Sequence, residues 1–405
     1  MVLNRLKNKI SLSGPKNESS EALAAADDVD EIDTENQSIL MGIISQLRPG
    51  CDLTRITLPT FILEKKSMLE RITNAFFTPQ ILFEANATED EVQRFLLVVK
   101  WYLSCWHIAP KAVKKPLNPV LGEIFGCYWN DLPDDSTAYY FSEQTSHHPP
   151  ESSYFYLVPE KRIRADGAII PKSKFLGNSS AAMMEGVAHL TFGEHANEVY
   201  SVTQPNVYCR GILFGKLRYE LGDHMLIKCE ANSLLADIEF KTKGFISGSY
   251  DAIEGVVRDT KTSRILYTIT GKWNGIIEIQ QGLDGKKEMF LDTTNLEVFK
   301  PKVKDFDAQL PNESRKLWHK TLMALDKRDH VAATDEKFKV EEDQRLKAKE
   351  RSEKGHHYEP DYFVRNNSNE IPFLIKTDIN IAEDSPEDMV SKLLTLHDIV
   401  AEESA

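Results

Sequence analysis

The pattern of apolar and polar positions divides the chain into a helical start, a long series of strands and a charged helical end. From about Cys127 to Val298, short apolar-rich runs alternate with turn residues, and Asp284-Gly285 has the composition of a hairpin turn. The clearest runs cover residues 187–192, 199–202, 265–270 and 276–279. No helix-length segment separates them. The pattern therefore predicts a mainly β fold with flanking helices, built as an antiparallel barrel or sandwich rather than as a parallel α/β sheet.

Two helices are predicted ahead of the strands. Apolar residues recur at helical spacing over 39–47 and stop at Pro49-Gly50. This short amphipathic segment is either packed on the body of the protein or a mobile flap. Thr88 and Glu91 have the spacing of a capping box in front of an apolar run that ends near Trp106, and we expect a buried helix there.

Two more helices are predicted after the strands. In the highly charged segment 335–354, helical spacing places Lys337, Glu341 and Arg345 along one face, a pattern typical of a solvated surface helix. Ser385-Pro386 suits an N-cap followed by proline in the first turn of a last helix. The apolar residues of that helix are Val390, Leu393, Leu394 and Val400. We expect it to be partly exposed or to dock locally, and we assign it no function.

The charge of the chain argues against nucleic acid as a partner. The 405 residues carry a net charge of −13, whereas nucleic-acid binding depends on neutralising phosphates with a basic surface. Eight acidic residues and no basic one lie between Glu18 and Glu35, which predicts a disordered acidic tail over residues 1–35. The tail is either a solubilising arm or a means of keeping the protein off anionic membranes. Any membrane contact should then be local and brief, made by a basic patch.

The apolar runs and the cysteines indicate the compartment. No apolar run reaches the roughly 18 residues that a spanning helix needs, and the N-terminus lacks the apolar stretch of a secretory signal. The five cysteines are scattered, lack the spacing of metal ligands and fit reduced thiols. We expect a cytoplasmic protein with neither a metal site nor a cofactor.

The segment Glu143-Gln144-Thr145-Ser146-His147-His148-Pro149-Pro150 carries the most specific chemistry of the chain. Proline pushes the residue before it into extended geometry, so the direction of the His148 ring is largely preset. Regular strand geometry would send the His147 and His148 side chains to opposite faces, so a strand must end or bulge here if both contact one ligand. The pair is typical of an anion-binding site, although two histidines can also simply satisfy a turn.

Three segments together resemble the signature of the oxysterol-binding-protein-related family of lipid-transfer proteins. They are the histidine segment, Lys115-Pro116-Leu117-Asn118-Pro119-Val120-Leu121-Gly122-Glu123, and Lys337, Glu341 and Arg345 at a spacing of four. Two further stretches are similar to the fungal members that exchange phosphatidylserine for phosphatidylinositol 4-phosphate. These are Leu58-Pro59-Thr60-Phe61-Ile62-Leu63-Glu64 and Pro171-Lys172-Ser173-Lys174-Phe175-Leu176-Gly177-Asn178-Ser179. The resemblance covers about residues 36 to 375.

The resemblance implies an incomplete, many-stranded antiparallel β-barrel that encloses a lipid tunnel and is closed by an N-terminal lid. It divides the chain into the acidic tail over 1–35, a lipid-binding domain over 36–375 and a C-terminal extension with a short helix over 376–405. Residues 36–64 are expected to form the lid. The family pattern thus favours the flap over ordinary packing for the segment 39–47.

The resemblance also implies which residues contact each lipid. The 4-phosphate is expected to contact His147, His148 and Arg345. The remaining phosphate and inositol groups are expected to contact Lys115, Asn118, Lys337 and Glu341. Phosphatidylserine is expected to contact Leu58, Ser173, Lys115 and Asn118. Because Lys115 and Asn118 serve both lipids, the two ligands exclude each other, and one site can act as an exchanger.

The function implied by the resemblance is non-vesicular exchange of the two lipids between membranes. It implies a monomer in the cytoplasm that contacts membranes transiently, at contact sites between the endoplasmic reticulum and the plasma membrane. Two alternatives remain: a sterol as the cargo exchanged for phosphatidylinositol 4-phosphate, or a lipid sensor without net transport. We do not expect an enzyme, because the sequence has no His-Glu-x-x-His helix, Gly-x-Ser-x-Gly elbow or Gly-rich nucleotide loop.

Overall fold

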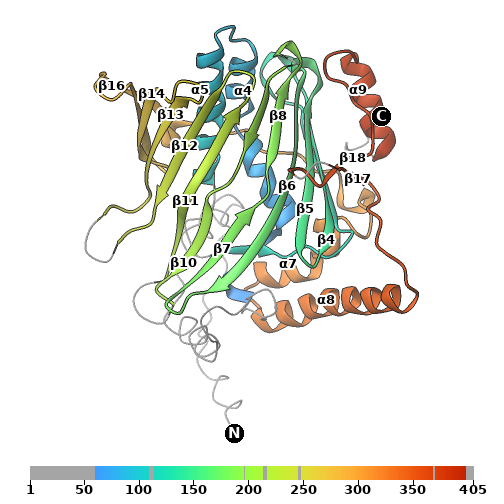
Figure 1. Cartoon of the computed structure of the whole chain (residues 1–405). Coiled ribbons are helices and arrows are strands. Elements are labelled where there is room, and N and C mark those ends of the chain that lie inside the picture. The colour runs from blue at the N-terminus through green and yellow to red at the C-terminus, as the bar shows by residue number, and fades with distance from the viewer. Residues whose placement is uncertain are drawn as a thin grey trace, which may run out of the picture.

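The computed structural model describes residues 60–108, 114–195, 197–212, 217–244, 248–367 and 370–397. Their main feature is one antiparallel sheet of 14 strands that curves into a barrel-like wall (Figure 1). Strands β3 and β16 lie at the two ends of its hydrogen-bonded order, so the barrel formed by the described residues is incomplete. The predicted mainly β fold with flanking helices is confirmed.

The predicted strand runs are all found in this sheet. Its strands are β3 (Ile124–Trp129), β4 (Ala138–His147), β5 (Pro150–Val158), β6 (Ile163–Phe175), β7 (Ser179–Glu185), β8 (Ala188–Phe192), β9 (Val199–Val202), β10 (Asn206–Arg210), β11 (Arg218–Cys229), β12 (Leu234–Lys241), β13 (Ala252–Asp259), β14 (Ile265–Lys272), β15 (Ile276–Gln281) and β16 (Lys287–Asp292). Asp284-Gly285 lies in the turn between β15 and β16, as predicted.

Strand β12 illustrates why this part of the sequence forms a sheet with one covered face. Its buried residues alternate with more exposed ones along the strand. The buried residues are Leu234, Ala236, Ile238 and Phe240, and the intervening ones are Leu235, Asp237, Glu239 and Lys241. A strand turns successive side chains to opposite faces, so this period of two gives an apolar inner face and a polar outer face.

The sheet divides into two branches between β6 and β11. The first half of β6, residues 163–167, pairs with β8, while its second half, residues 170–175, pairs with β7. Strand β8 continues through β9 to the end of β11, and β7 continues through β10 to the beginning of β11. Two separate ladders therefore connect the two longest strands.

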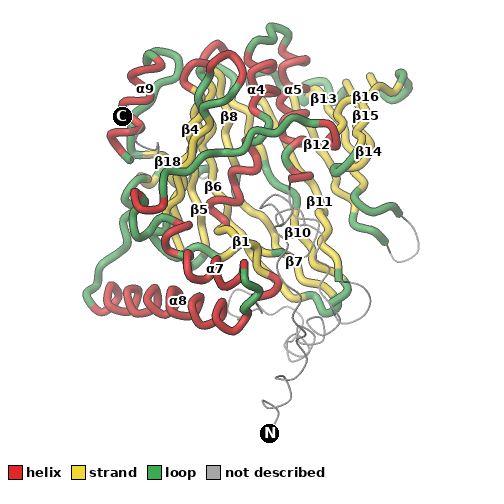
Figure 2. Tube along the Cα trace, turned by 180° about the vertical axis from the view of Figure 1, so that it is seen from behind, coloured by secondary structure: helices red, strands yellow, loops and turns green. Residues whose placement is uncertain are grey.

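Helices cover the inner side of the sheet. The segment before β2 (Lys115–Leu117) contains β1 (Leu63–Ser67) and a series of short and long helices (Figure 2). These helices are η2 (Thr60–Ile62), α3 (Met68–Arg71), η3 (Ile72–Phe76), α4 (Pro79–Asn86), α5 (Glu91–Ser104) and η4 (Trp106–Ile108). Buried residues of α5, such as Phe95 and Val99, share one apolar cluster with strand residues such as Ile227 and Ile238. The predicted buried helix before Trp106 is thus confirmed.

The cap of α5 differs from the prediction. The N-cap is Asp90, whose carboxylate accepts hydrogen bonds from the backbone N–H groups of Val92 (3.0 Å) and Gln93 (2.9 Å). Thr88 instead donates its hydroxyl to the carbonyl oxygen of Glu84, at the end of α4. The predicted capping box of Thr88 and Glu91 is wrong because Asp90, immediately before the first helical residue, supplies the acceptor for the free N–H groups.

The C-terminal part of the chain packs beside β1 with α6 (Ser314–Leu317) and α7 (His319–Asp326), and on the outer face of the sheet with α9 (Pro386–Leu396). It also contains α8 (His330–Glu353) and the strands β17 (Phe363–Arg365) and β18 (Phe373–Ile375). Ser385 caps α9 with its hydroxyl, as predicted, and Pro386 occupies the first turn. Met389 and Leu393 of α9 pack with Phe141 and Phe155 of the sheet, so the last helix docks. Val400, which was expected in this helix, lies outside the described residues.

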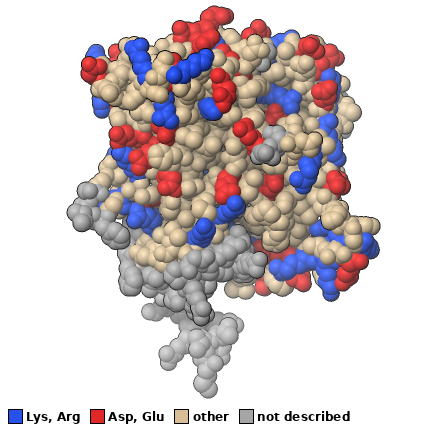
Figure 3. Space-filling view, viewed as in Figure 1, with Lys and Arg blue, Asp and Glu red and all other residues tan. Residues whose placement is uncertain are grey.

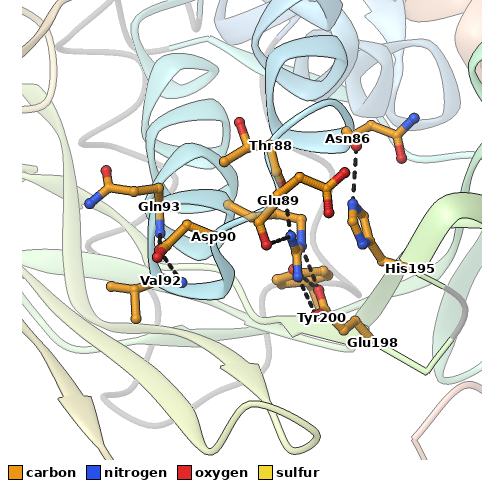
Figure 4. A network of polar contacts seen from close by, with 10 residues as sticks. Asn86, Thr88, Glu89, Asp90, Val92, Gln93, His195, Glu198 and Tyr200 are labelled. Atoms are coloured by element: carbon orange, nitrogen blue, oxygen red, sulfur yellow. Dashed lines mark hydrogen bonds and ion pairs between the residues drawn. The ribbon is translucent and has the colours of Figure 1, made fainter.

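A buried ion pair joins the start of α5 to the wall of the barrel (Figure 4). The Arg94 guanidinium donates to both carboxylate oxygens of Glu198, at 2.8 and 2.5 Å, and to the carbonyl oxygens of Thr88 and Glu89. The Tyr200 hydroxyl also donates to Glu198. Burial would raise the pKa of Glu198, but the hydrogen bonds from Arg94 and Tyr200 outweigh it and lower the pKa of this carboxyl group.

We expect Arg94→Met to lower the free energy of unfolding by about 3–5 kcal/mol, because it leaves the buried Glu198 carboxylate without its partner. Adding Glu198→Gln should restore part of the loss. Urea denaturation measures both effects. The control is Lys228→Met, which breaks an exposed pair with Glu230 and should cost at most about 1 kcal/mol. An equally small loss for Arg94→Met would contradict the structural importance of the pair.

Candidate functional site

A cavity of about 350 Å³ lies between the sheet and the helices on its inner side. Most of its wall is apolar, with residues from η3, α5 and at least six strands. Representative apolar residues are Ile72, Phe76, Trp101, Tyr102, Ile169, Leu190, Val202, Val207 and Tyr219. Its polar residues include Lys114, Lys115, Asn118, Gln144, Ser173, Lys337 and Glu341. Several of these come from α8, β2 and the end of β6, at the lower end of the molecule in Figure 1.

The structure brings five of the predicted site residues to this cavity. Lys115, Asn118, Ser173, Lys337 and Glu341 all contribute to its lining, although they come from three distant parts of the sequence. Strand β2, which begins at Lys115, pairs in parallel with β1, whose first two residues, Leu63 and Glu64, are the last of the predicted lid. Leu58 and residues 36–59 of that lid lie outside the described residues, so these predictions stay predictions.

The buried carboxylate of Glu123 fixes the loop that follows β2. One of its oxygens accepts hydrogen bonds from the Val120 N–H (3.0 Å) and the Trp318 indole N–H (2.9 Å). The other accepts the Ser314 hydroxyl at 2.7 Å. Burial raises the pKa of Glu123, while these hydrogen bonds oppose the rise. The loop that presents Asn118 is therefore attached to the α6–α7 region.

The histidine segment lies beside the same loop. Strand β4 ends at His147, and its pairing with β5 contains an irregularity between Gln144 and Ser146. The rings of His147 and His148 lie with their centroids 4.6 Å apart, and Nδ1 of His147 is 3.3 Å from the Pro119 carbonyl oxygen. The condition stated from the sequence, a strand that ends or bulges if both rings are to share a ligand, is met.

The electrostatics of His147 reflect this position. Burial lowers its pKa, the neighbouring His148 ring lowers it further, and the hydrogen bond to Pro119 and the Glu341 carboxylate oppose the shift. Neither histidine lines the cavity itself, but their neighbours Gln144 and Pro150 do. The pair thus lies at the edge of the polar end, within electrostatic reach of Glu341.

Helix α8 carries three of the predicted residues, and only two of them line the cavity. Lys337 and Glu341 form an ion pair with each other and line the cavity. Arg345 does not line it: the Arg345 Nε donates to Glu342 at 2.7 Å, and the side chain is 54% exposed. A guanidinium carries four N–H groups besides Nε, so Arg345 can keep Glu342 and still offer donors to a phosphate.

Two residues that were not singled out in the sequence also shape the polar end. Lys114 lines the cavity and donates to the carbonyl oxygen of Phe61 at 3.3 Å. Gln144 lines it too, accepts the Ser152 hydroxyl and donates to the Ser146 carbonyl, which positions the chain ahead of the histidines. The only signals in the sequence were that Lys114 precedes Lys115 and that Gln144 belongs to the histidine segment.

Comparisons with known proteins agree with the geometry. The family model described as "Oxysterol-binding protein" matches residues 42–378. The chain belongs to the oxysterol-binding protein family. It is 62% identical over 339 residues to oxysterol-binding protein-like protein OBPa of Candida albicans, covering 84% of this chain and 78% of the relative. It is 53% identical over 383 residues to oxysterol-binding protein homolog 6 of Saccharomyces cerevisiae, covering 92% and 84%.

Solved structures of family members share the fold. The Osh1 ORD domain in complex with cholesterol superposes with a TM-score of 0.70 at 25% identity, covering 85% of this chain and 88% of that one. The Osh3 ORD of S. cerevisiae in complex with PI(4)P gives a TM-score of 0.64 at 20% identity, covering 92% and 96%. Members of the family bind and transfer lipids, so the chain carries a lipid-transfer domain.

None of the described helices is long and apolar enough to span a bilayer. Within the same residues, no three histidine, cysteine, aspartate or glutamate side chains are grouped so that they could hold a metal ion.

The contact between the two rings leads to a pH prediction. His148→Ala should raise the pKa of His147, because it removes the neighbouring ring that disfavours protonation of His147. Histidine resonances followed by NMR across a pH series would measure the shift. His357→Ala, which removes an exposed imidazole elsewhere, is the control and should leave His147 unchanged. An unaltered His147 titration in His148→Ala would show that the two rings do not interact.

Proposed function

We propose that the protein extracts phosphatidylserine from one membrane and exchanges it for phosphatidylinositol 4-phosphate from another. The single observation that carries this proposal is the cavity, whose apolar body ends in a group of polar and charged residues. A phosphoinositide head group offers two phosphates and several hydroxyls, and it needs several converging donors. Lys115, Asn118 and Lys337 offer such donors beside the two histidines, and the Glu341 carboxylate accepts hydrogen bonds from the inositol hydroxyls.

The apolar part of the cavity suits the acyl chains. Two chains of about 17 carbons, at ~0.8 kcal/mol per CH₂, represent roughly 25 kcal/mol of burial, before any ordering costs. A protein that removes such a lipid from a bilayer has to offer the chains a closed apolar space. The expected lid over 36–64 would complete that enclosure.

The two proposed cargoes would share one end of the cavity. In this proposal, His147, His148 and Arg345 contact the 4-phosphate. Leu58 and Ser173 contact the serine head group. Lys115 and Asn118 serve both lipids, so binding of one excludes the other and the protein acts as an exchanger. This requires no enzymatic step, and we propose that a monomer acts peripherally at contacts between the endoplasmic reticulum and the plasma membrane.

A sterol is the second candidate cargo, and one feature of the cavity favours it. Asn74 Oδ1 and the indole N–H groups of Trp101 and Trp106 lack hydrogen-bond partners among the described residues, although all three residues line the cavity. A buried polar group without a partner is costly, and a hydroxyl carried into the cavity by a sterol would supply one. The Osh1 complexes with cholesterol and ergosterol are compatible with this alternative. Mass spectrometry of lipids that co-purify with the protein would separate the two cargoes.

The histidine pair provides a direct test of the proposed phosphoinositide site. His147→Ala with His148→Ala should abolish extraction of phosphatidylinositol 4-phosphate from liposomes and leave much of the phosphatidylserine extraction intact, because only the former lipid carries the 4-phosphate. The matched control is His356→Ala with His357→Ala, an adjacent pair that is exposed. Extraction of the phosphoinositide at the unaltered rate by the His147/His148 variant would sink the assignment.

A Leu58 variant tests the proposed serine site, and here the extraction of phosphatidylserine should fall instead of that of the phosphoinositide. Leu58→Asp should selectively reduce phosphatidylserine extraction, because it would place a carboxylate beside the anionic head group. Parallel extraction assays with both lipids measure the selectivity. An equal loss of both would indicate a general defect instead. Transfer between donor and acceptor liposomes, followed with the unaltered protein, distinguishes an exchanger from a sensor that only binds.

A further inference from the structure

Helix α8 exposes an apolar stripe that no part of the proposed cargo site uses. The stripe consists of Val331, Phe338 and Leu346, whose side chains are 74%, 56% and 58% exposed. Their spacing of seven and eight residues places them on one side of the helix, within roughly 80° of each other at about 100° per residue. The rest of α8 is strongly polar, so these three large apolar side chains stand out on its surface.

The α8 stripe lies next to the side of the helix that lines the cavity. At about 100° per residue, Arg345 follows Glu341 by roughly 40° around the helix, and Phe338 follows Arg345 by roughly 20°. The Arg345 guanidinium lies 5.3 Å from the centre of the Phe338 ring. On the far side, Ala333 and Gln344 are buried against the body of the protein. The stripe therefore borders the polar end of the cavity rather than the core.

The orientation of α8 suits contact with a flat surface. Figures 1 and 2 both show the helix lying across the lower end of the barrel, crossing the direction of the strands. At the same end, the β6–β7 hairpin carries Leu176, which is 50% exposed, three residues beyond the cavity-lining Ser173. Apolar side chains on two separate elements thus accompany the polar end of the cavity.

The charges beside the stripe are balanced rather than basic. Arg345 pairs with Glu342, and Lys349 lies 3.8 Å from Glu353. In Figure 3, blue and red atoms lie side by side at the lower right of the molecule, where α8 runs. A face with paired charges gains little from anionic lipids, so the attraction must come from the apolar side chains.

We propose that the α8 stripe inserts into the interface of a zwitterionic bilayer and places the polar end of the cavity against the membrane. This inference rests on the proposed lipid transfer, because cargo has to pass between the bilayer and that end. Large exposed apolar side chains gain free energy when they enter the bilayer interface, even on a helix as polar overall as α8. Insertion should be weakly dependent on salt, which separates it from the basic patch expected from the sequence.

The most direct test places a tryptophan in the stripe. Phe338→Trp should gain fluorescence, relative to the unaltered protein, that is quenched by vesicles of brominated phosphatidylcholine without either proposed cargo lipid. The control is Met289→Trp, at a side chain that is 69% exposed on β16, and it should not be quenched. Absence of quenching at 338, or equal quenching at both positions, would overturn the proposal.

A second test measures binding and transfer. Phe338→Asp with Leu346→Asp should lower the fraction of protein that floats with phosphatidylcholine vesicles about tenfold, since it replaces two inserting side chains with charges. The control is Leu283→Asp with Met289→Asp, which removes two apolar residues of the β15–β16 hairpin that are even more exposed, at 70% and 69%. Equal urea midpoints would establish that both variants fold. Unchanged flotation of the α8 variant would refute insertion of the α8 stripe into the bilayer. The proposal about the cargo lipids is tested separately, by the extraction assays.

Discussion

Two buried carboxylates hold the family motifs in place, and the polar end of the cavity depends on both. Glu123 ends the loop after β2, and its carboxylate accepts hydrogen bonds from the Ser314 hydroxyl and the Trp318 indole N–H, far along the chain. Glu143 begins the histidine segment and accepts the Tyr358 hydroxyl at 2.7 Å. Their strands are neighbours, since Gln144 N–H donates to the Glu123 carbonyl. One antiparallel pair thus presents both motifs, and each motif is anchored by an ionisable group that is costly to bury without such partners.

The sequence allowed the architecture to be predicted because the strands obey a local rule. Alternation with a period of two, as in β12, marks a strand wherever it occurs, and Ser385 marks the start of α9 by its cap. The cap of α5 was misassigned because Thr88 and Asp90 are both good N-cap residues and only the backbone decides between them. The pairing of Arg94 with Glu198 could not be predicted, because 104 residues separate the partners and neither has a distinctive neighbourhood.

Of the predicted site residues that the structure describes, some line the cavity and others do not. Lys115, Asn118, Ser173, Lys337 and Glu341 were inferred from motifs and do meet at one cavity. Helical spacing correctly put Lys337, Glu341 and Arg345 near one another, yet a step of four residues turns the helix by about 400°, so Arg345 drifts from the cavity side onto the exposed side. The rotation of α8 about its own axis is set by tertiary contacts, through the burial of Ala333 and Gln344. No local sequence pattern specifies it.

Because the sheet divides into two branches, the polar end of the cavity can change its width without breaking the barrel. The branch of β7 and β10 lines the cavity near Ser173, while the branch of β8 and β9 joins the opposite halves of β6 and β11. If the β7–β10 ladder parts, the other ladder still holds β6 to β11, so opening costs four residue pairs rather than the whole sheet. The wall can therefore widen at the polar end of the cavity while β6 and β11 stay connected through β8 and β9.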